Sequence, residues 1–241
     1  EEVAGHISQT HAEVLVSQVI SPYFARFTHG ATVVPRFLFL VDEQPAAPLG
    51  TGSGRTSVRS RRSPLEKDPW KFAPSLDGAV EQQFIRQLCL GESLLPYRLI
   101  ELRSAVIPLR DGALLPEDEI DQYQGLSRWW LKAEAAWKKG RSRASMELSE
   151  RLDYHHGLSK QTRDEPYKVV YAKSGAYLAA ALVYDASVVI DHKLYWAPMS
   201  SLDEANFLLG ILNSNALTQL VRPYQALGEH NPRDFDKNVL R

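Results

Sequence analysis

The chain contains the stretch Tyr167-Lys-Val-Val-Tyr-Ala-Lys-Ser-Gly175, and two more apolar stretches follow it directly, at 177–184 and 187–196. Tight turns are expected between them, at Ser174-Gly175 and at Asp185-Ala186. Strand-length apolar segments separated by such turns predict three strands, and a meander is the simplest arrangement for them. The fold is therefore expected to be organised around an antiparallel sheet in this region.

A long helix is predicted ahead of this sheet. Acidic residues in 116–121 favour the positive N-terminal end of a helix that runs to about Lys139, with Gly140 behind it as a C-cap. Three of the five tryptophans lie in it, interleaved with cations. Trp130 and Trp137 share helical spacing, so packing is the economical role for two of the three, while the cations form an outer face.

Two short helices are predicted after the sheet. Ser201-Leu-Asp-Glu204 has the spacing of a capping box, and the apolar run 205–212 follows it. Asn213 and Ser214 are expected to cap helix ends, ahead of a second helix over 216–221.

The first half of the chain alternates strand-like and loop-like segments. Apolar, β-branched residues predict strands over 14–20 and 32–41 in one sheet. Residues 44–74 are rich in Pro, Gly, Ser, Thr and Arg, which predicts a long loop or a short-strand excursion, and long ordered loops tend to be functional. Helical spacing then predicts a helix over 76–91, and strand character returns over 99–109.

The composition is that of an ordinary globular protein, with 241 residues, 44% of them hydrophobic, and a formal net charge of −1. No stretch approaches the roughly 20 apolar residues of a membrane span, and a single cysteine excludes an internal disulfide framework, so a cytoplasmic location is expected. The order of segments predicts an α+β fold with a mixed, mostly antiparallel sheet and flanking helices. Two parts are expected, 1–120 and 121–241, unless they form one continuous domain. Because Glu stands at the first position, the chain is expected to be a piece of a longer protein.

Basic residues cluster in two segments despite the balanced net charge. Within 55–67, four arginines and one lysine accompany a single acidic residue, Glu66, and residues 121–175 hold 11 basic and 7 acidic side chains. Because phosphate binding depends on local clusters of charge, the two segments are candidates for a polyanion-binding surface. The alternative is that they are solvated loops and helix faces.

Several further motifs are weaker indicators of chemistry. The Gly-x-Gly-x-Gly pattern in 49–55 lacks a preceding strand and a following apolar helix, which favours a flexible basic loop over a nucleotide site. Asp185 and Asp191-His-Lys193 resemble a nuclease metal site, but they lack a third acid. His155 and His156 are adjacent, so they favour a polar helix end over a metal site. Cys89 is flanked by leucines, and burial is expected.

Blocks across nearly the whole chain resemble the region C-terminal to the catalytic domain in large adenine DNA methyltransferases of restriction-modification systems, the N-6 DNA methylase family. Their order and spacing carry the resemblance. The blocks are 21–36, 58–63, 66–71, 90–97, 151–154, 170–175, 190–197, 211–214 and 233–237.

The resemblance implies a target-recognition region without the catalytic domain. In that family the catalytic tetrapeptide is (Asn/Asp/Ser)-Pro-Pro-(Tyr/Phe/Trp), whereas Ser21-Pro-Tyr23 and Asp68-Pro-Trp70 each contain one proline. The fragment is therefore expected to be no enzyme and to hold no cofactor, with S-adenosylmethionine implied for the parent protein. Its implied partners are double-stranded DNA and the parent's catalytic domain, with no membrane partner.

Basic and polar side chains in this region are expected to contact DNA phosphates and base edges. The expected DNA-binding residues are Arg55, Arg59, Arg61, Arg62, Lys67, Lys138, Lys139, Arg141, Arg143, Lys173, Ser174, His192 and Lys193. Two alternatives remain at this point. One is a structural or interaction domain of the same parent that contacts no DNA, and the other, less favoured, is a metal-dependent nuclease.

Overall fold

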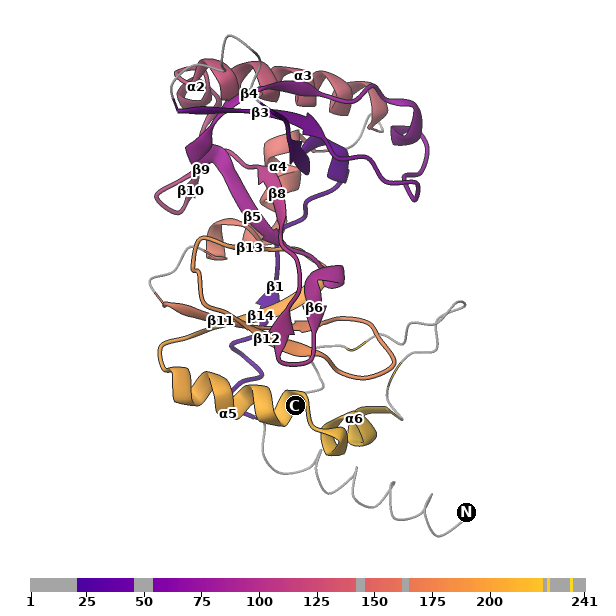
Figure 1. Ribbon diagram of the computed structural model, residues 1–241, viewed down its shortest axis with the longest axis vertical. Coiled ribbons are helices and arrows are strands. Elements are labelled where there is room, and N and C mark those ends of the chain that lie inside the picture. Colours follow the sequence, from indigo (N-terminus) through magenta and orange to yellow (C-terminus); the bar gives the residue numbers. More distant parts are fainter. Residues whose placement is uncertain are drawn as a thin grey trace.

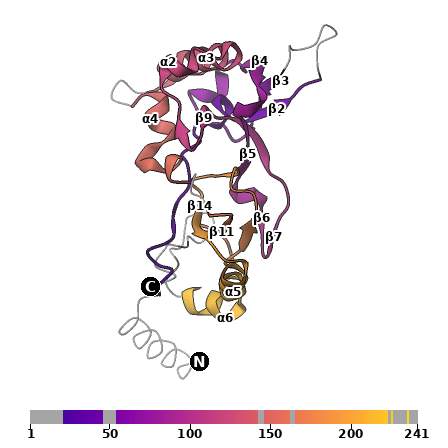
Figure 2. The ribbon, with the colours of Figure 1, turned by 90° about the vertical axis from the view of Figure 1, so that its left-hand side faces the viewer.

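A computed structural model describes residues 21–45, 54–141, 146–161, 165–222, 225 and 235. The described chain is an α+β protein in which mostly antiparallel strands are flanked by helices, as the sequence predicts. The elements form two stacked parts, called the upper part and the lower part after their places in Figure 1, and Figure 2 shows the same stacking from the side. Within the described ranges, no helix is long and apolar enough to cross a membrane.

The lower part is built on a four-stranded antiparallel sheet in the order β1-β14-β11-β12. Helix α5 (Leu202–Leu212) packs on it through buried leucines, and α6 (Asn215–Val221) follows. The predicted N-caps are confirmed, because the Ser201 and Ser214 hydroxyls accept from the N–H groups of Glu204 and Leu217. Of the capping box predicted at Ser201, only this half is seen, and the Glu204 carboxylate pairs with Arg26. The strands are β1 (Thr28–His29), β11 (Tyr167–Ala172), β12 (Ala180–Val183) and β14 (Leu194–Met199).

The predicted meander is wrong in its third member. Strand β13 (Val189–Ile190) leaves the sheet of the lower part and pairs in parallel with β5 (Ile85–Cys89) of the upper part. The chain then returns as β14, which pairs with β11. Both residues of β13 are buried, Val189 in the core of the upper part and Ile190 in a third apolar cluster shared by the two parts. A strand buried on both faces needs cover from two sides, and the boundary between the parts supplies it.

The upper part holds two three-stranded sheets, ordered β2-β3-β4 and β13-β5-β8, and the long helix α3 (Gln124–Gly140) packs on β4. All three tryptophans of α3 are buried. The remaining strands are β2 (Val41–Glu43), β3 (Arg55–Ser60), β4 (Asp77–Glu81), β6 (Leu94–Leu95), β7 (Arg98–Leu99), β8 (Arg103–Val106), β9 (Leu109–Arg110) and β10 (Ala113–Leu114). The remaining helices are α2 (Glu117–Ile120), α4 (Leu148–Leu152), and the 3-10 turns η1 (Arg36–Leu38), η2 (Trp70–Phe72), η3 (Gln82–Phe84), η4 (Gly91–Ser93), η5 (Tyr154–His156) and η6 (Ser159–Gln161).

The helix predicted over 76–91 is wrong, because this segment forms β4, η3 and β5. Val80, Phe84 and Leu88, which suggested the helix, are all fully buried in one core. A spacing of four residues places side chains on one face of a helix, but it also fits the two-residue alternation of a strand. Pairing of β4 with β3 and of β5 with β8 decides between the two periods.

Two other predicted elements are interrupted. The strand expected over 32–41 is broken by η1, where Phe37, Leu38 and the following Phe39 are fully buried, and β2 begins only at its end. The helix expected over 116–139 is split into α2 and α3. The carboxylate of Glu81 accepts from the N–H groups of Gly125 and Leu126, at 3.0 and 2.8 Å, and so starts a new helix there. Gly140 is the last residue of α3. The strand predicted over 14–20 lies outside the described residues.

Candidate nucleic-acid interface

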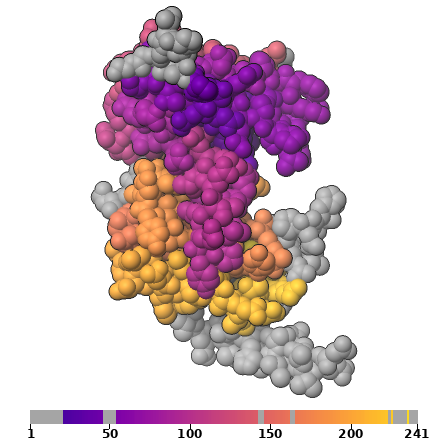
Figure 3. All heavy atoms as spheres, viewed as in Figure 1, coloured from indigo at the N-terminus to yellow at the C-terminus, as the bar shows by residue number. Residues whose placement is uncertain are grey.

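Residues 61–72, which lie in the segment between β3 and β4, stand out at one side of the upper part and are called the basic excursion (Figures 1 and 3). The Arg62 side chain makes several contacts within this segment and stabilises its conformation. Its guanidinium donates to the carbonyls of Trp70 and Ala73, at 2.9 and 2.6 Å, pairs with Glu66 at 2.5 Å, and lies 4.6 Å from the ring centroid of Phe37. Arg62 thus orders the excursion by satisfying its backbone acceptors.

The basic excursion is joined to the C-terminal end of α3. The indole rings of Trp70 and Trp137 stack with centroids 5.5 Å apart and planes 4° apart. Gly140 permits this contact, because a Cβ atom there would lie 2.2 Å from the Trp70 ring. The cations of the basic excursion and those at the C-terminal end of α3 therefore lie near one another at this end of the molecule, whereas Arg55 does not.

Four exposed lysines lie on these two neighbouring segments. They are Lys67 and Lys71 on the basic excursion and Lys138 and Lys139 on α3. Lys138 also lies 3.6 Å from Glu134, one turn earlier on the helix. Lysine side chains this exposed keep their long stems mobile and their charges in water, which suits contacts to a phosphate backbone.

The other predicted arginines of this region differ in their surroundings. Arg61 pairs with Asp42 at 2.6 Å, and Arg141 pairs with Glu147 at 2.8 Å. Arg55 pairs with Glu81 at 2.9 Å, at the end of β3 that is far from the basic excursion. Arg59 is exposed on β3. Arg143 lies outside the described residues.

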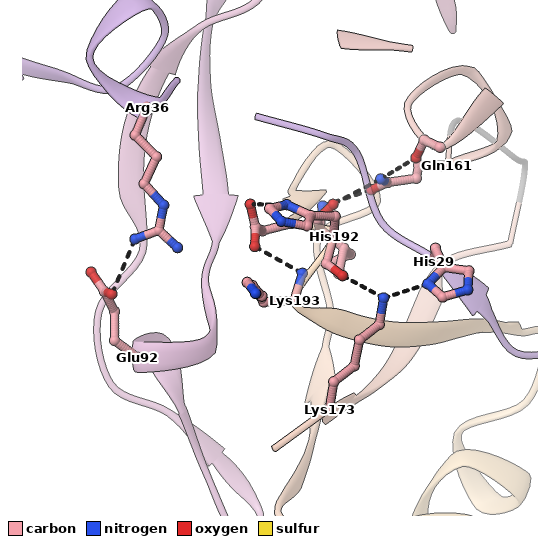
Figure 4. A network of polar contacts seen from close by, with 10 residues as sticks. His29, Arg36, Glu92, Gln161, Lys173, His192 and Lys193 are labelled. Atoms are coloured by element: carbon pink, nitrogen blue, oxygen red, sulfur yellow. Dashed lines mark hydrogen bonds and ion pairs between the residues drawn. The ribbon is translucent and has the colours of Figure 1, made fainter. Parts of the chain in front are cut away.

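Three predicted residues of the lower part, Lys173, His192 and Lys193, form one cluster at the end of the sheet, as Figure 4 shows, and the fourth, Ser174, follows Lys173 in the chain. The Lys173 ammonium donates to the His192 carbonyl, contacts the His29 ring, and lies 4.4 Å from the ring centroid of Tyr195. Lys193 and Ser174 are exposed beside it. The sequence separates these residues by about twenty positions, and antiparallel pairing of β11 with β14 brings them together.

A buried carboxylate shapes this cluster. Asp191 is 0% exposed and accepts from the Lys193 N–H at 2.9 Å and from His192 Nδ1 at 3.1 Å. It therefore fixes the turn that carries two of the predicted DNA contacts. Figure 4 also shows the ion pair of Arg36 and Glu92, 3.4 Å long, on the other side of Lys193 from Lys173.

The molecular surface is hollowed between the basic excursion and the lower part on the side where the excursion projects (Figure 3). Sequence reasoning missed Arg36 and Lys71 as candidates for this region, although both stand inside the blocks that carry the family resemblance. Their signal was weak because Arg36 is isolated among apolar residues and Lys71 follows the tryptophan that anchors the excursion.

The residues that resemble a nuclease site have structural partners. The Asp191 carboxylate accepts a hydrogen bond from the Lys193 N–H in its own turn. The Asp185 carboxylate accepts from the Ser187 N–H at 2.8 Å. Hydrogen bonds from Ser187 hold the pKa of Asp185 below its ordinary value. In the described ranges, no group of three or more His, Cys, Asp or Glu residues is placed to hold a metal ion.

The structure also shows the surroundings of the cysteine and of the adjacent histidines singled out in the sequence. Cys89 is buried, as predicted, and burial raises the pKa of its thiol to about 12. His155 and His156 are exposed at η5. The glycine pattern of 49–55 lies mostly outside the described residues. A separate pocket of about 320 Å³, lined by Arg86, Gln161 and Lys168 among others, contains none of the predicted DNA-binding residues.

Comparison with solved structures gives a weak likeness. No family model matches the chain, and no curated protein matches its sequence. A solved structure described as the Type IIL restriction-modification enzyme MmeI in complex with DNA is similar at a TM-score of 0.37 and 15% sequence identity. The match covers 57% of this chain and 17% of that chain. A likeness of this size assigns neither a family nor a function to this protein.

Proposed function

We propose that this chain is the DNA target-recognition region of a restriction-modification adenine methyltransferase, and that it binds duplex DNA while a separate domain of the parent transfers the methyl group. The observation that carries the proposal is the contact between the two basic segments. Trp70 of the basic excursion stacks on Trp137 of α3, so the lysines of the excursion and those at the end of α3 share one end of the upper part. Phosphates along a duplex require such a grouping of cations from distant parts of a chain.

In this proposal the cluster around Lys173 and Lys193 would supply a second cationic surface for the duplex. It lies in the lower part, and the surface is hollowed between this part and the basic excursion. Two cationic surfaces that flank a hollow can hold the two backbones of a duplex, since both strands carry one phosphate per nucleotide. Base reading would then come from polar side chains of this cluster, such as Ser174 and His192.

The absence of catalysis is part of the proposal. The sequence lacks the Pro-Pro tetrapeptide of the resembling family, so the chain is expected to bind no S-adenosylmethionine and to transfer no methyl group by itself. The parent's catalytic domain would supply the cofactor and the chemistry, and this chain would position the duplex.

The test is a fluorescence anisotropy titration of the 241-residue chain against labelled duplex DNA at several salt concentrations. Binding that weakens as salt rises, with a linear dependence of log K on log salt, is the expected result. No binding at the lowest salt would overturn the proposal and favour the alternative in which this region contacts only the parent's catalytic half. Incubation of the same preparation with S-adenosylmethionine and DNA should leave the DNA unmethylated.

A further inference from the structure

The basic excursion carries two exposed apolar side chains. Leu65 is 86% exposed and Phe72 is 78% exposed, which makes them the two most exposed large hydrophobic residues in the described ranges. Single exposed leucines are common on protein surfaces, but two such side chains on one projecting, cation-rich segment are not explained by the folded core.

Both side chains stand on ordered backbone. The N–H of Leu65 donates to the Ser63 hydroxyl at 3.2 Å, and the N–H of Ser63 donates to the Glu66 carboxylate at 3.0 Å. Near Phe72, the Arg62 guanidinium donates to the Lys71 carbonyl at 3.1 Å. The excursion is thus held by hydrogen bonds before any partner arrives, which reduces the entropy lost on binding.

Cations flank both apolar side chains. Lys67 follows Leu65 by two positions, and the Lys71 ammonium lies 5.7 Å from the ring centroid of Phe72. The partner that fits this combination must offer negative charge beside apolar surface. Duplex DNA does so, because phosphates border the grooves and the faces of stacked bases are apolar, and apolar wedges of Leu or Phe between base steps are a known way to open a stack.

We propose that Leu65 and Phe72 are apolar wedges that enter the stacked bases of the duplex, with Lys67 and Lys71 holding the adjacent phosphates. This inference rests on the proposed function and adds to it that the excursion distorts the DNA as well as gripping it. Unstacking a base step costs free energy, and the wedge recovers it by burying apolar surface that is exposed in the free protein.

A duplex with a built-in defect tests the wedge. A single mismatch weakens stacking in advance, so a protein that inserts a wedge binds the mismatched duplex more tightly than the same duplex fully paired. The test compares both affinities by anisotropy for the unmodified chain, for Leu65→Ala and for Phe72→Ala. We expect about a tenfold preference for the mismatched duplex, and a loss of most of that preference in Phe72→Ala.

Matched controls carry the same chemical change elsewhere. Leu131→Ala on α3 and Phe207→Ala on α5 remove side chains that are each 62% exposed, and they should leave the preference unchanged. Binding of paired DNA without any preference for the mismatch would overturn the wedge and leave the proposed function standing. If Leu65→Ala and Phe72→Ala both keep the preference for the mismatched duplex, the wedge proposal is also overturned. That result would point to the parent's catalytic domain as the partner of Leu65 and Phe72. No binding to either duplex would overturn the proposed function together with the wedge.

Discussion

The ring of Trp70 lies parallel to the ring of Trp137, 5.5 Å from it between centroids, and it is the contact by which the basic excursion reaches α3. Trp70 belongs to the segment between two strands of a sheet, whereas Trp137 belongs to a helix that begins more than fifty residues later. One stacked pair therefore sets the distance between two groups of exposed lysines.

Replacing Trp137 by Ala should lower the free energy of unfolding by about 3–5 kcal/mol, because it removes a buried indole, its stacking and its hydrogen bond to the Met146 carbonyl. Trp70→Ala should cost less, since Trp70 is only partly buried, but it should speed trypsin cleavage after Lys67 and Lys71. Urea denaturation and timed proteolysis measure the two effects. Trp70→Phe keeps a ring against Trp137 and should stay close to the unmodified chain, so equal cleavage rates in all variants would contradict the assigned anchor.

Glu81→Gln should destabilise the fold by about 1–2 kcal/mol, because the Glu81 carboxylate accepts from Arg55 and from the first N–H groups of α3. Burial of the Glu81 carboxyl raises its pKa, whereas hydrogen bonds from Gly125, Leu126 and Arg55 lower it. The net result is a pKa below the ordinary value of 4.5. The contribution of Glu81 to the free energy of unfolding is therefore fully present above its ordinary pKa and is lost as pH falls through the lowered pKa.

Urea denaturation at neutral and acidic pH measures the effect of Glu81→Gln. Glu92→Gln is the matched control, since it removes only an exposed ion pair with Arg36 and should change the free energy of unfolding by less than about 1 kcal/mol. Equal effects of the two substitutions at neutral pH would contradict the capping role of Glu81.

Lys168 should make the fold more stable as pH rises above neutrality. It is 2% exposed, donates to the carbonyls of Ala186 and Val188, and burial lowers its pKa from 10.5 to about 8. Between about pH 8 and 10.5 the unfolded chain keeps a proton that the folded chain releases. The free energy of unfolding therefore rises, by at most about 1.4 kcal/mol per pH unit.

The measurement is urea denaturation at a series of pH values for the unmodified chain and for Lys168→Met. The variant is expected to lose this rise, whatever its stability at neutral pH. Parallel pH profiles for the two proteins would contradict the lowered pKa.

Cys89 should react with a thiol reagent only when the fold opens. It is fully buried, and its pKa of about 12 leaves almost no thiolate near neutral pH. Labelling of the folded chain is expected to be about a thousandfold or more slower than labelling in urea. Since Cys89 is the single cysteine of the sequence, the signal is unambiguous. Rapid labelling of the folded chain would contradict burial of the third apolar cluster.

Lys71→Ala and Lys139→Ala should each reduce the slope of log K against log salt for DNA binding by about 1, because each would remove one of the proposed phosphate contacts. Lys132→Ala is the matched control, since the Lys132 ammonium already donates to the Asp77 carbonyl at 2.7 Å. Anisotropy titrations at several salt concentrations give all slopes. A change in Lys132→Ala equal to that in Lys71→Ala would contradict the assignment of the interface to the basic excursion.

Local sequence signals predicted the parts of this fold that depend on local contacts. The caps at Ser201 and Ser214 are confirmed, since a hydroxyl and an N–H three residues apart are enough to make them. The segment 76–91 was mistaken for a helix because its apolar spacing fits two periods, and only pairing with distant strands selects one. The path of β13 was missed for the same reason, as its partner β5 lies about a hundred residues earlier.

Prediction of the candidate site was limited in the same way. The sequence indicated which cations exist, but nothing local shows that Arg62 satisfies carbonyls of its own segment or that Arg55 supports a helix start. Whether the predicted residues contact DNA stays a prediction. What the fold adds is a grouping, with lysines of 67–71 beside those of 138–139, and Lys173 beside His192.

The parallel pairing of β13 with β5, together with the apolar cluster formed by residues from both parts, bears on how a ligand could be selected. A movement of the lower part away from the upper part would have to break that pairing and expose Trp196 and Ile190 to water. Under the proposed function, this pairing would hold the two parts at a fixed spacing when DNA binds. Selection would operate by dimension, with helices of unsuitable diameter excluded at no conformational cost to the protein.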